Sequence, residues 1–155
     1  MQRTIARIPS WPGREEFRAL EPPADRGSSP RVLLVEDSKV NQLLVQAMME
    51  TSSYPVEVAS SGEEALQRLA VAPYDIVLMD VSMPGMDGLQ VTRALREAKD
   101  GPNARTRIIA LTAHAMDGDR EACLAAGMDD YLTKPINRRE LLEKLALWAD
   151  KGPRA

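Results

Sequence analysis

The chain has 155 residues, with 20 lysines and arginines against 23 aspartates and glutamates, a formal net charge of −3 at pH 7, and one cysteine. This length suits one domain with an ordinary core, and the slight acidity argues against a nucleic-acid-binding surface, which needs a basic patch. One cysteine forms no internal disulfide, no apolar run predicts a membrane span, and the first residues lack the apolar core of a signal peptide, so we expect a cytoplasmic domain without membrane contact.

Residues 1–30 differ in composition from the rest of the chain. They are rich in proline, glycine, serine and charged residues and show no sustained hydrophobic period. Proline fixes φ and removes a backbone donor, so this stretch is a poor candidate for regular structure. We expect a linker or arm over residues 1–30, with a short amphipathic turn at 15–20 as its one local feature, a folded domain over 31–150 and a short tail over 151–155.

From residue 31 onward, strand and helix signals alternate five times. Apolar or alternating runs predict strands at residues 32–36, 56–60, 75–80, 107–112 and 130–133. Helical spacing and capping residues predict helices over residues 38–50, from Ser61 to about residue 72, from just after Asp87, from about residue 117 to Gly127, and from Asn137 through Trp148. Strict alternation indicates an α/β fold with parallel strands and right-handed crossovers. We expect a five-stranded, doubly wound, flavodoxin-like sheet of order 2-1-3-4-5, although periodicity alone does not exclude other orders.

For several helices, the sequence predicts the side that faces the core or the residue that caps an end. In the first helix, apolar residues at helical spacing predict the side that packs on the core; they are Val40, Leu43, Leu44, Ala47 and Met48. Ser61 and Glu64 form the pattern of a capping box for the second helix, and Asp87 is expected to cap the third. Gly127 suits the left-handed position that ends the fourth. In the last helix, Leu141, Leu142 and Leu145 are expected to face the core.

Polar residues follow four of the five predicted strands. Glu36 and Asp37 end the first strand, Asp80 the third and Thr112 the fourth, while Lys134 follows the fifth. In open parallel sheets, ligands bind at the carboxyl ends of the strands, beside the switch in strand order. The sequence therefore predicts a crevice with three carboxylates, a hydroxyl and an ammonium.

Three carboxylates in one crevice repel each other and raise their own pKa values unless a cation compensates them. Mg²⁺ prefers oxygen ligands and keeps several waters, so an open coordination position can accept a phosphoryl oxygen. Phosphoryl transfer depends mainly on such positioning and charge neutralisation. Asp80 is the candidate nucleophile, because aspartate is known to form acyl-phosphate intermediates.

Taken together, these residues resemble the response-regulator receiver domain. The resemblance covers about residues 31–148 and is carried by four stretches in order, "LLVEDSKVNQLL", "DIVLMDVSMPGMDG", "IIALTAHAM" and "GMDDYLTKPI". The residues of the second and third stretches look most like those of receivers attached to hybrid histidine kinases. The resemblance implies a signalling domain in a two-component or phosphorelay system rather than a metabolic enzyme.

The resemblance also implies a role for each site residue. Asp80 would take the phosphoryl group from a phosphohistidine of a histidine kinase or histidine phosphotransfer protein. Glu36, Asp37 and Asp80 would hold Mg²⁺ together with the backbone carbonyl of Ser82.

The remaining roles concern the phosphoryl oxygens and the response to them. Thr112 and Lys134 would contact these oxygens, and the Lys134–Pro135 peptide would be cis. Tyr131 occupies the position of the family's switch aromatic and would turn inward when Thr112 moves.

The residues disfavour three other functions. A receiver fold that binds partners without chemistry should have lost one of the acids, the threonine or the lysine, and none is lost here. A Mg²⁺-dependent phosphohydrolase with an aspartate nucleophile needs a second acid two residues later, where this chain has Ser82. A flavin-binding module is disfavoured because an acidic crevice repels a phosphate unless a metal is bound.

Overall fold

The computed structural model describes residues 30–113 and 117–154, so the predicted arm over residues 1–30 lies outside the described part except for Pro30. The strands are β1 (Val32–Val35), β2 (Val56–Ala59), β3 (Ile76–Asp80), β4 (Arg107–Thr112) and β5 (Asp130–Thr133). The helices are α2 (Lys39–Met49), α3 (Gly62–Val71), α4 (Gly88–Glu97), α5 (Asp117–Ala126) and α6 (Arg138–Lys151). Every predicted strand and helix is present within three residues of its expected bounds.

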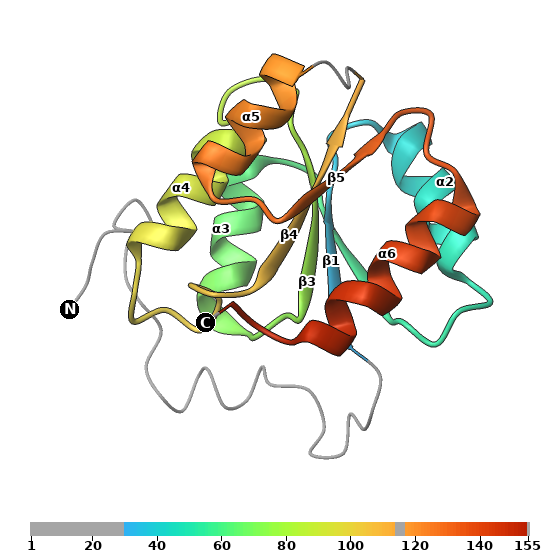
Figure 1. Ribbon diagram of the computed structural model, residues 1–155, viewed down its shortest axis with the longest axis horizontal. Helices are drawn as coiled ribbons and strands as arrows, with labels where there is room; N and C mark the ends of the chain where they lie inside the picture. Colours follow the sequence, from blue (N-terminus) through green and yellow to red (C-terminus); the bar gives the residue numbers. More distant parts are fainter. Residues whose placement is uncertain (1–29, 114–116, 155) are drawn as a thin grey trace.

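The five strands form one parallel sheet of order β2-β1-β3-β4-β5. Helices α3, α4 and α5 cover one face, and α2 and α6 cover the other (Figure 1). The predicted flavodoxin-like, doubly wound order is confirmed. The switch in strand order falls at β1, between β2 and β3, which places the carboxyl ends of β1 and β3 side by side.

The two layers of helices enclose two cores, and the strands contribute to both. Successive side chains of a strand point to opposite faces; in β1, Leu33 and Val35 join the core under α3, α4 and α5, while Val32 and Leu34 join the core under α2 and α6. The strand β3 repeats this division. A strand buried on both faces must be apolar throughout, which explains the continuous apolar runs in the sequence.

The predicted helix ends are largely confirmed. Asp87 forms a full capping box with Gln90 at the start of α4, and Gly127 has a φ of 111° just after α5. At α3, the Ser61 hydroxyl accepts from the N–H of Glu64, but the Glu64 carboxylate accepts from the N–H of Ser60 rather than that of Ser61. The expected capping box is therefore shifted by one residue on its second bond.

The predicted core face of α2 is wrong. Val40, Leu43 and Leu44 are 68%, 57% and 50% exposed, and the residues of α2 that face the core are instead Gln42, Val45 and Met49. Of the predicted face, Met48 is partly buried against the core, whereas Val40, Leu43 and Leu44 lie on the exposed side of the helix. In α6, by contrast, Leu141 and Leu145 are fully buried as expected and Leu142 is partly buried.

The residues after α6 pack against the amino end of the sheet. The backbone N–H of Arg154 donates to the carbonyl of Arg105 over 2.8 Å, and Arg107 donates from Nε to the carbonyl of Gly152 over 2.7 Å. None of the helices in the described ranges is both long and apolar enough to span a membrane.

Candidate functional site

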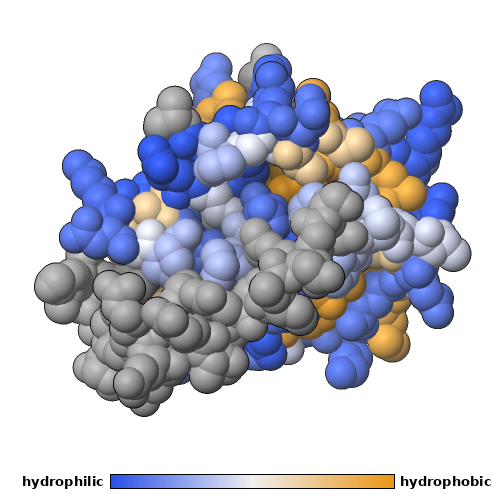
Figure 2. Space-filling model, turned by 90° about the horizontal axis from the view of Figure 1, so that it is seen from below, coloured by the Kyte–Doolittle hydropathy of each residue, from blue (hydrophilic) through white to orange (hydrophobic). Residues whose placement is uncertain are grey.

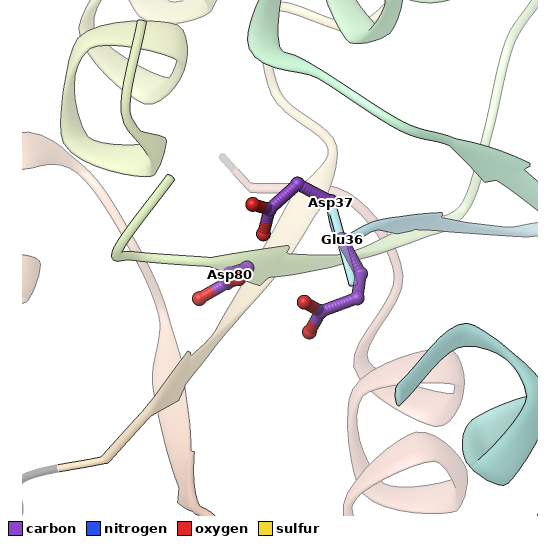
Figure 3. A group of neighbouring side chains, drawn as sticks. All are labelled: Glu36, Asp37 and Asp80. Carbon is purple, nitrogen blue, oxygen red and sulfur yellow. The ribbon is translucent and has the colours of Figure 1, made fainter. Parts of the chain in front are cut away.

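Three carboxylates meet at the carboxyl ends of β1 and β3. Oxygen atoms of Glu36, Asp37 and Asp80 all lie within 4.8 Å of one another. Figure 3 shows that Asp80 comes from the end of β3 and that the other two come from the segment following β1. Glu36 and Asp80 are buried, whereas Asp37 is exposed. The grouping of acids predicted from the strand ends is thus present.

Lys134 is the cation that faces these acids. Its Nζ lies 3.2 Å from Glu36 Oε1 and 3.2 Å from Asp80 Oδ1. The peptide between Lys134 and Pro135 is cis, as expected. Two backbone N–H groups add to the lysine: Ser38 donates to Glu36 Oε2 and Ser82 donates to Asp80 Oδ1, each over 3.1 Å.

The pKa values show how unevenly these acids are compensated. Burial, followed by the charge of Glu36, raises the pKa of Asp80 to about 6, and Lys134 only partly opposes this. Burial would also raise the pKa of Glu36, but the Ser38 N–H, Asp80 and Lys134 together hold it below its ordinary value. Burial would lower the pKa of Lys134, yet the charges of Asp80 and Glu36 raise it. The buried pair therefore carries a charge that one lysine does not neutralise.

The donor set fits a hard divalent cation. Three carboxylates face one ammonium, so the ionised group keeps an excess of negative charge. All candidate ligands are oxygens, which Mg²⁺ prefers, and one of the acids is open to solvent, as an ion that keeps several waters requires.

The other predicted residues lie around this crevice. Thr112 is buried at the end of β4, one residue beyond Leu111, which is paired with Asp80. The N–H of Lys134 donates to the Thr112 carbonyl over 2.7 Å, which joins the two residues through their backbones. Tyr131 lies on β5, partly buried, with Arg120 and Lys144 each 5.8 Å from its ring centroid.

The loop after β3 is closed by a close backbone approach. A Cβ on Gly88 would lie 2.4 Å from the backbone oxygen of Asp80, a distance that no other residue type tolerates. The N–H of Gly88 donates to the carbonyl of Val81 over 3.3 Å. The start of α4 is thereby held directly against the strand end that carries Asp80.

One residue near the acids was not singled out from the sequence. Gln42 of α2 is 5% exposed, and its side-chain amide donates to the backbone carbonyl of Glu36 over 2.6 Å. A polar residue in the same helical row as Val45 and Met49 is the signal that could have identified it.

Comparison with known proteins assigns this arrangement to a family. The sequence profile of the response regulator receiver domain matches residues 32–146. The chain is 44% identical over 134 residues to the sensor histidine kinase GacS of Pseudomonas protegens, covering 84% of this chain and 15% of that protein. It is 40% identical over 110 residues to the histidine-protein kinase BarA of Escherichia coli, covering 71% of this chain and 12% of that protein. The chain thus spans only a small part of these relatives.

Solved structures agree with this assignment. The receiver domain of a Pseudomonas aeruginosa sensor histidine kinase, solved with a magnesium ion coordinated in its active-site cleft, is 43% identical with a TM-score of 0.71. The comparison covers 79% of this chain and 98% of that one. The chemotaxis response regulator CheY4 of Vibrio cholerae is 31% identical with a TM-score of 0.72, over 77% of this chain and 98% of its own.

Proposed function

Because the chain belongs to the response-regulator receiver family, a signalling rather than a metabolic family, we propose that it accepts a phosphoryl group on Asp80. The observation that carries this proposal is the buried carboxylate of Asp80 between two further acids and a single lysine. A charge placed in such surroundings costs free energy; a cation bound among the acids would offset that cost and would also attract the oxygens of an incoming phosphoryl group.

In the proposed step, a carboxylate oxygen of Asp80 attacks the phosphorus of a phosphohistidine on a partner. A P–O bond forms to Asp80 and the P–N bond breaks, so that the electron pair returns to the imidazole of the partner. The step needs Asp80 in its ionised form, and the Ser82 N–H favours that form by donating to it.

Glu36, Asp37 and Asp80 would hold Mg²⁺, with the Ser82 carbonyl as the fourth protein ligand. When bound, the ion would neutralise the charge of the acids and of the phosphoryl oxygens. Lys134 would contact another phosphoryl oxygen, since its Nζ already lies 3.2 Å from the Asp80 carboxylate. The hydroxyl of Thr112, at the neighbouring strand end, would contact a further one.

Tyr131 would report the phosphorylated state to a partner. Its ring lies on the face of the sheet covered by α3, α4 and α5, next to the strand that carries Thr112. A shift of Thr112 toward the phosphoryl group would open space beside Ala110, the β4 neighbour of Tyr131, for the ring to turn inward.

The donor would be a histidine kinase or a histidine phosphotransfer protein, bound over the exposed apolar side of α2. Val40, Leu43 and Leu44 lie on this side. Beside them is a cavity of about 200 Å³ whose lining includes Leu44, Met48 and Ile136 as well as Glu36 and Lys134 of the site. Figure 2 views the molecule from the end of the sheet opposite the crevice, and part of the hydrophobic surface seen there lies on the side that carries α2 and α6. A donor histidine must reach Asp80, so a partner covering this side would approach the crevice directly.

The deciding experiment is to incubate the full chain with Mg²⁺ and acetyl phosphate and to record its intact mass, with Asp80→Asn as the control. A Mg²⁺-dependent, base-labile phosphate adduct on the wild type alone is expected. If no adduct forms although the metal binds, beryllofluoride binding at Asp80 separates a short-lived phosphoryl group from a domain that binds partners without chemistry.

A further inference from the structure

The amide of Gln42 is a buried polar group on the core side of α2. Gln42 is 5% exposed and shares its helical row with Val45 and Met49, both of which are buried. Burying an amide without hydrogen bonds costs free energy that a leucine in its place would not incur. A glutamine in this row therefore points to a specific contact.

Gln42 makes two such contacts with its side-chain nitrogen. Nε2 donates to the backbone carbonyl of Glu36 over 2.6 Å and to the hydroxyl of Ser60 over 3.1 Å. A carbonyl oxygen can only accept, so the atom facing it must be the NH₂ group. The side chain thus connects α2 to the end of β1 and to the loop that follows β2.

The carbonyl that Gln42 holds belongs to the peptide between Glu36 and Asp37. Rotation of this peptide would displace the Asp37 side chain relative to those of Glu36 and Asp80. The Asp37 carboxylate is exposed, and within the described residues no hydrogen bond or ion pair fixes it. Its place in the acid group therefore depends on the backbone that Gln42 holds.

We infer that Gln42 is a positioning residue for the metal site: through the carbonyl of Glu36 it holds the Glu36–Asp37 peptide at the orientation in which both carboxylates face Asp80. This inference rests on the proposed metal-binding function of the acids. Residues that orient metal ligands without touching the ion typically change metal affinity by about 10- to 100-fold when they are replaced.

The test is Gln42→Met, which keeps the volume of the side chain and removes the donor. Mn²⁺ serves as the probe, because it favours the same oxygen ligands and its free ion is measured directly by electron paramagnetic resonance. We expect the full-length variant to bind Mn²⁺ roughly tenfold more weakly than the wild type, while circular dichroism shows both to be folded at the temperature of the titration.

Gln46→Met is the matched control, since Gln46 is the next glutamine on α2 and is exposed. It should bind Mn²⁺ as the wild type does. Equal affinity of Gln42→Met and the wild type would overturn the inference and leave Gln42 a purely structural residue, whatever happens to the melting temperature. Absence of Mn²⁺ binding in the wild type would instead overturn the proposed function on which the inference rests.

A second variant keeps the inference testable if Gln42→Met does not fold. Ser60→Ala changes an exposed residue and removes one of the two acceptors that orient the Gln42 amide. A two- to threefold weaker Mn²⁺ affinity, roughly 0.4–0.7 kcal/mol, is expected because the stronger contact to Glu36 remains. Unchanged affinity in this folded variant would then contradict the inference.

Discussion

The two ends of the sheet both bury charged side chains, with opposite balances. At the carboxyl end, three carboxylates face one lysine. At the amino end, Asp129 faces three arginines: Arg96 at 3.2 Å, Arg107 at 3.0 Å and Arg154 at 3.7 Å. The ion pairs of the amino end connect β4, α4 and the residues after α6 to one another, so this group of charges holds parts of the fold together.

The difference lies in what satisfies the excess charge. At the amino end, Arg96 donates to the carbonyls of Gly127, Ala104 and Thr106 over 2.7–3.0 Å, so the backbone itself satisfies this cation. Burial, followed by the charge of Arg154, still lowers the pKa of Arg96 to about 10. At the carboxyl end, the donors to the buried acids among the described residues are two backbone N–H groups and one lysine. We conclude that burial of charge alone does not indicate function, whereas charge left uncompensated by the fold does.

The largest effect on stability is expected from Arg96→Met. Removing this guanidinium leaves the carbonyls of Ala104 and Thr106 without their donor and removes one partner of the buried Asp129. Breaking a buried ion pair from one side typically costs about 3–5 kcal/mol, and we expect a loss of roughly 3 kcal/mol in the free energy of unfolding, measured with urea.

Arg93→Met, one turn earlier on α4 and exposed, is the matched control and should stay within about 0.5 kcal/mol of the wild type. The folded Arg96→Met protein should still form the acetyl phosphate adduct. If Arg96→Met keeps its stability and loses the adduct, the amino end would be the functional end of the sheet and not the structural one.

Asp80→Asn should have the opposite effect on stability. The pKa of Asp80 rises from 3.8 to about 6 on folding, so the folded state favours the protonated form. The resulting stabilisation is present below pH 3.8 and is lost as the pH rises through 6. At pH 8 in EDTA, the ionised carboxylate costs up to about 3 kcal/mol, and the neutral asparagine should recover part of it.

Urea unfolding at several pH values measures this difference. The advantage of Asp80→Asn over the wild type should be greatest near pH 8 and should shrink toward pH 4. Asp100→Asn, at an exposed position, is the control and should show no such trend. An Asp80→Asn protein less stable than the wild type at pH 8 would show that Lys134 already compensates the acids.

Most of the fold and the whole acid group were accessible from the sequence for identifiable reasons. Strands covered on both faces must be apolar throughout, so β1, β3 and β4 can be recognised in the sequence as continuous runs of apolar residues. Parallel strands bring their carboxyl ends to one edge of the sheet, so the sequence alone predicts that Glu36, Asp80 and Lys134 lie together.

The parts that were missed involve backbone partners or unpartnered faces. Arg96 binds carbonyl oxygens, which every residue has, so no sequence pattern marks its role. In α2 the apolar residues form a helical stripe, yet the buried row lies beside that stripe and includes Gln42, which its two hydrogen bonds allow. Periodicity identifies an apolar stripe on a helix but does not say whether the stripe packs on the core of its own domain or on a partner protein.

The smallest effect on stability is expected from Leu43→Lys. This variant tests whether the partner that donates the phosphoryl group to Asp80 binds over the exposed apolar side of α2. Leu43 is 57% exposed, so a lysine should leave the stability within about 0.5 kcal/mol of the wild type. If a phosphorylated histidine phosphotransfer domain binds over α2, the variant should accept its phosphoryl group at least fivefold more slowly, as expected for a loss of about 1 kcal/mol in a docking contact. The rate with acetyl phosphate, which needs no docking surface, should not change.

Leu147→Lys, at a 46% exposed position on α6, is the matched control. Equal slowing by both variants would point to a general effect of added charge, and no slowing by Leu43→Lys would move the partner away from α2 while leaving the chemistry of Asp80 untouched.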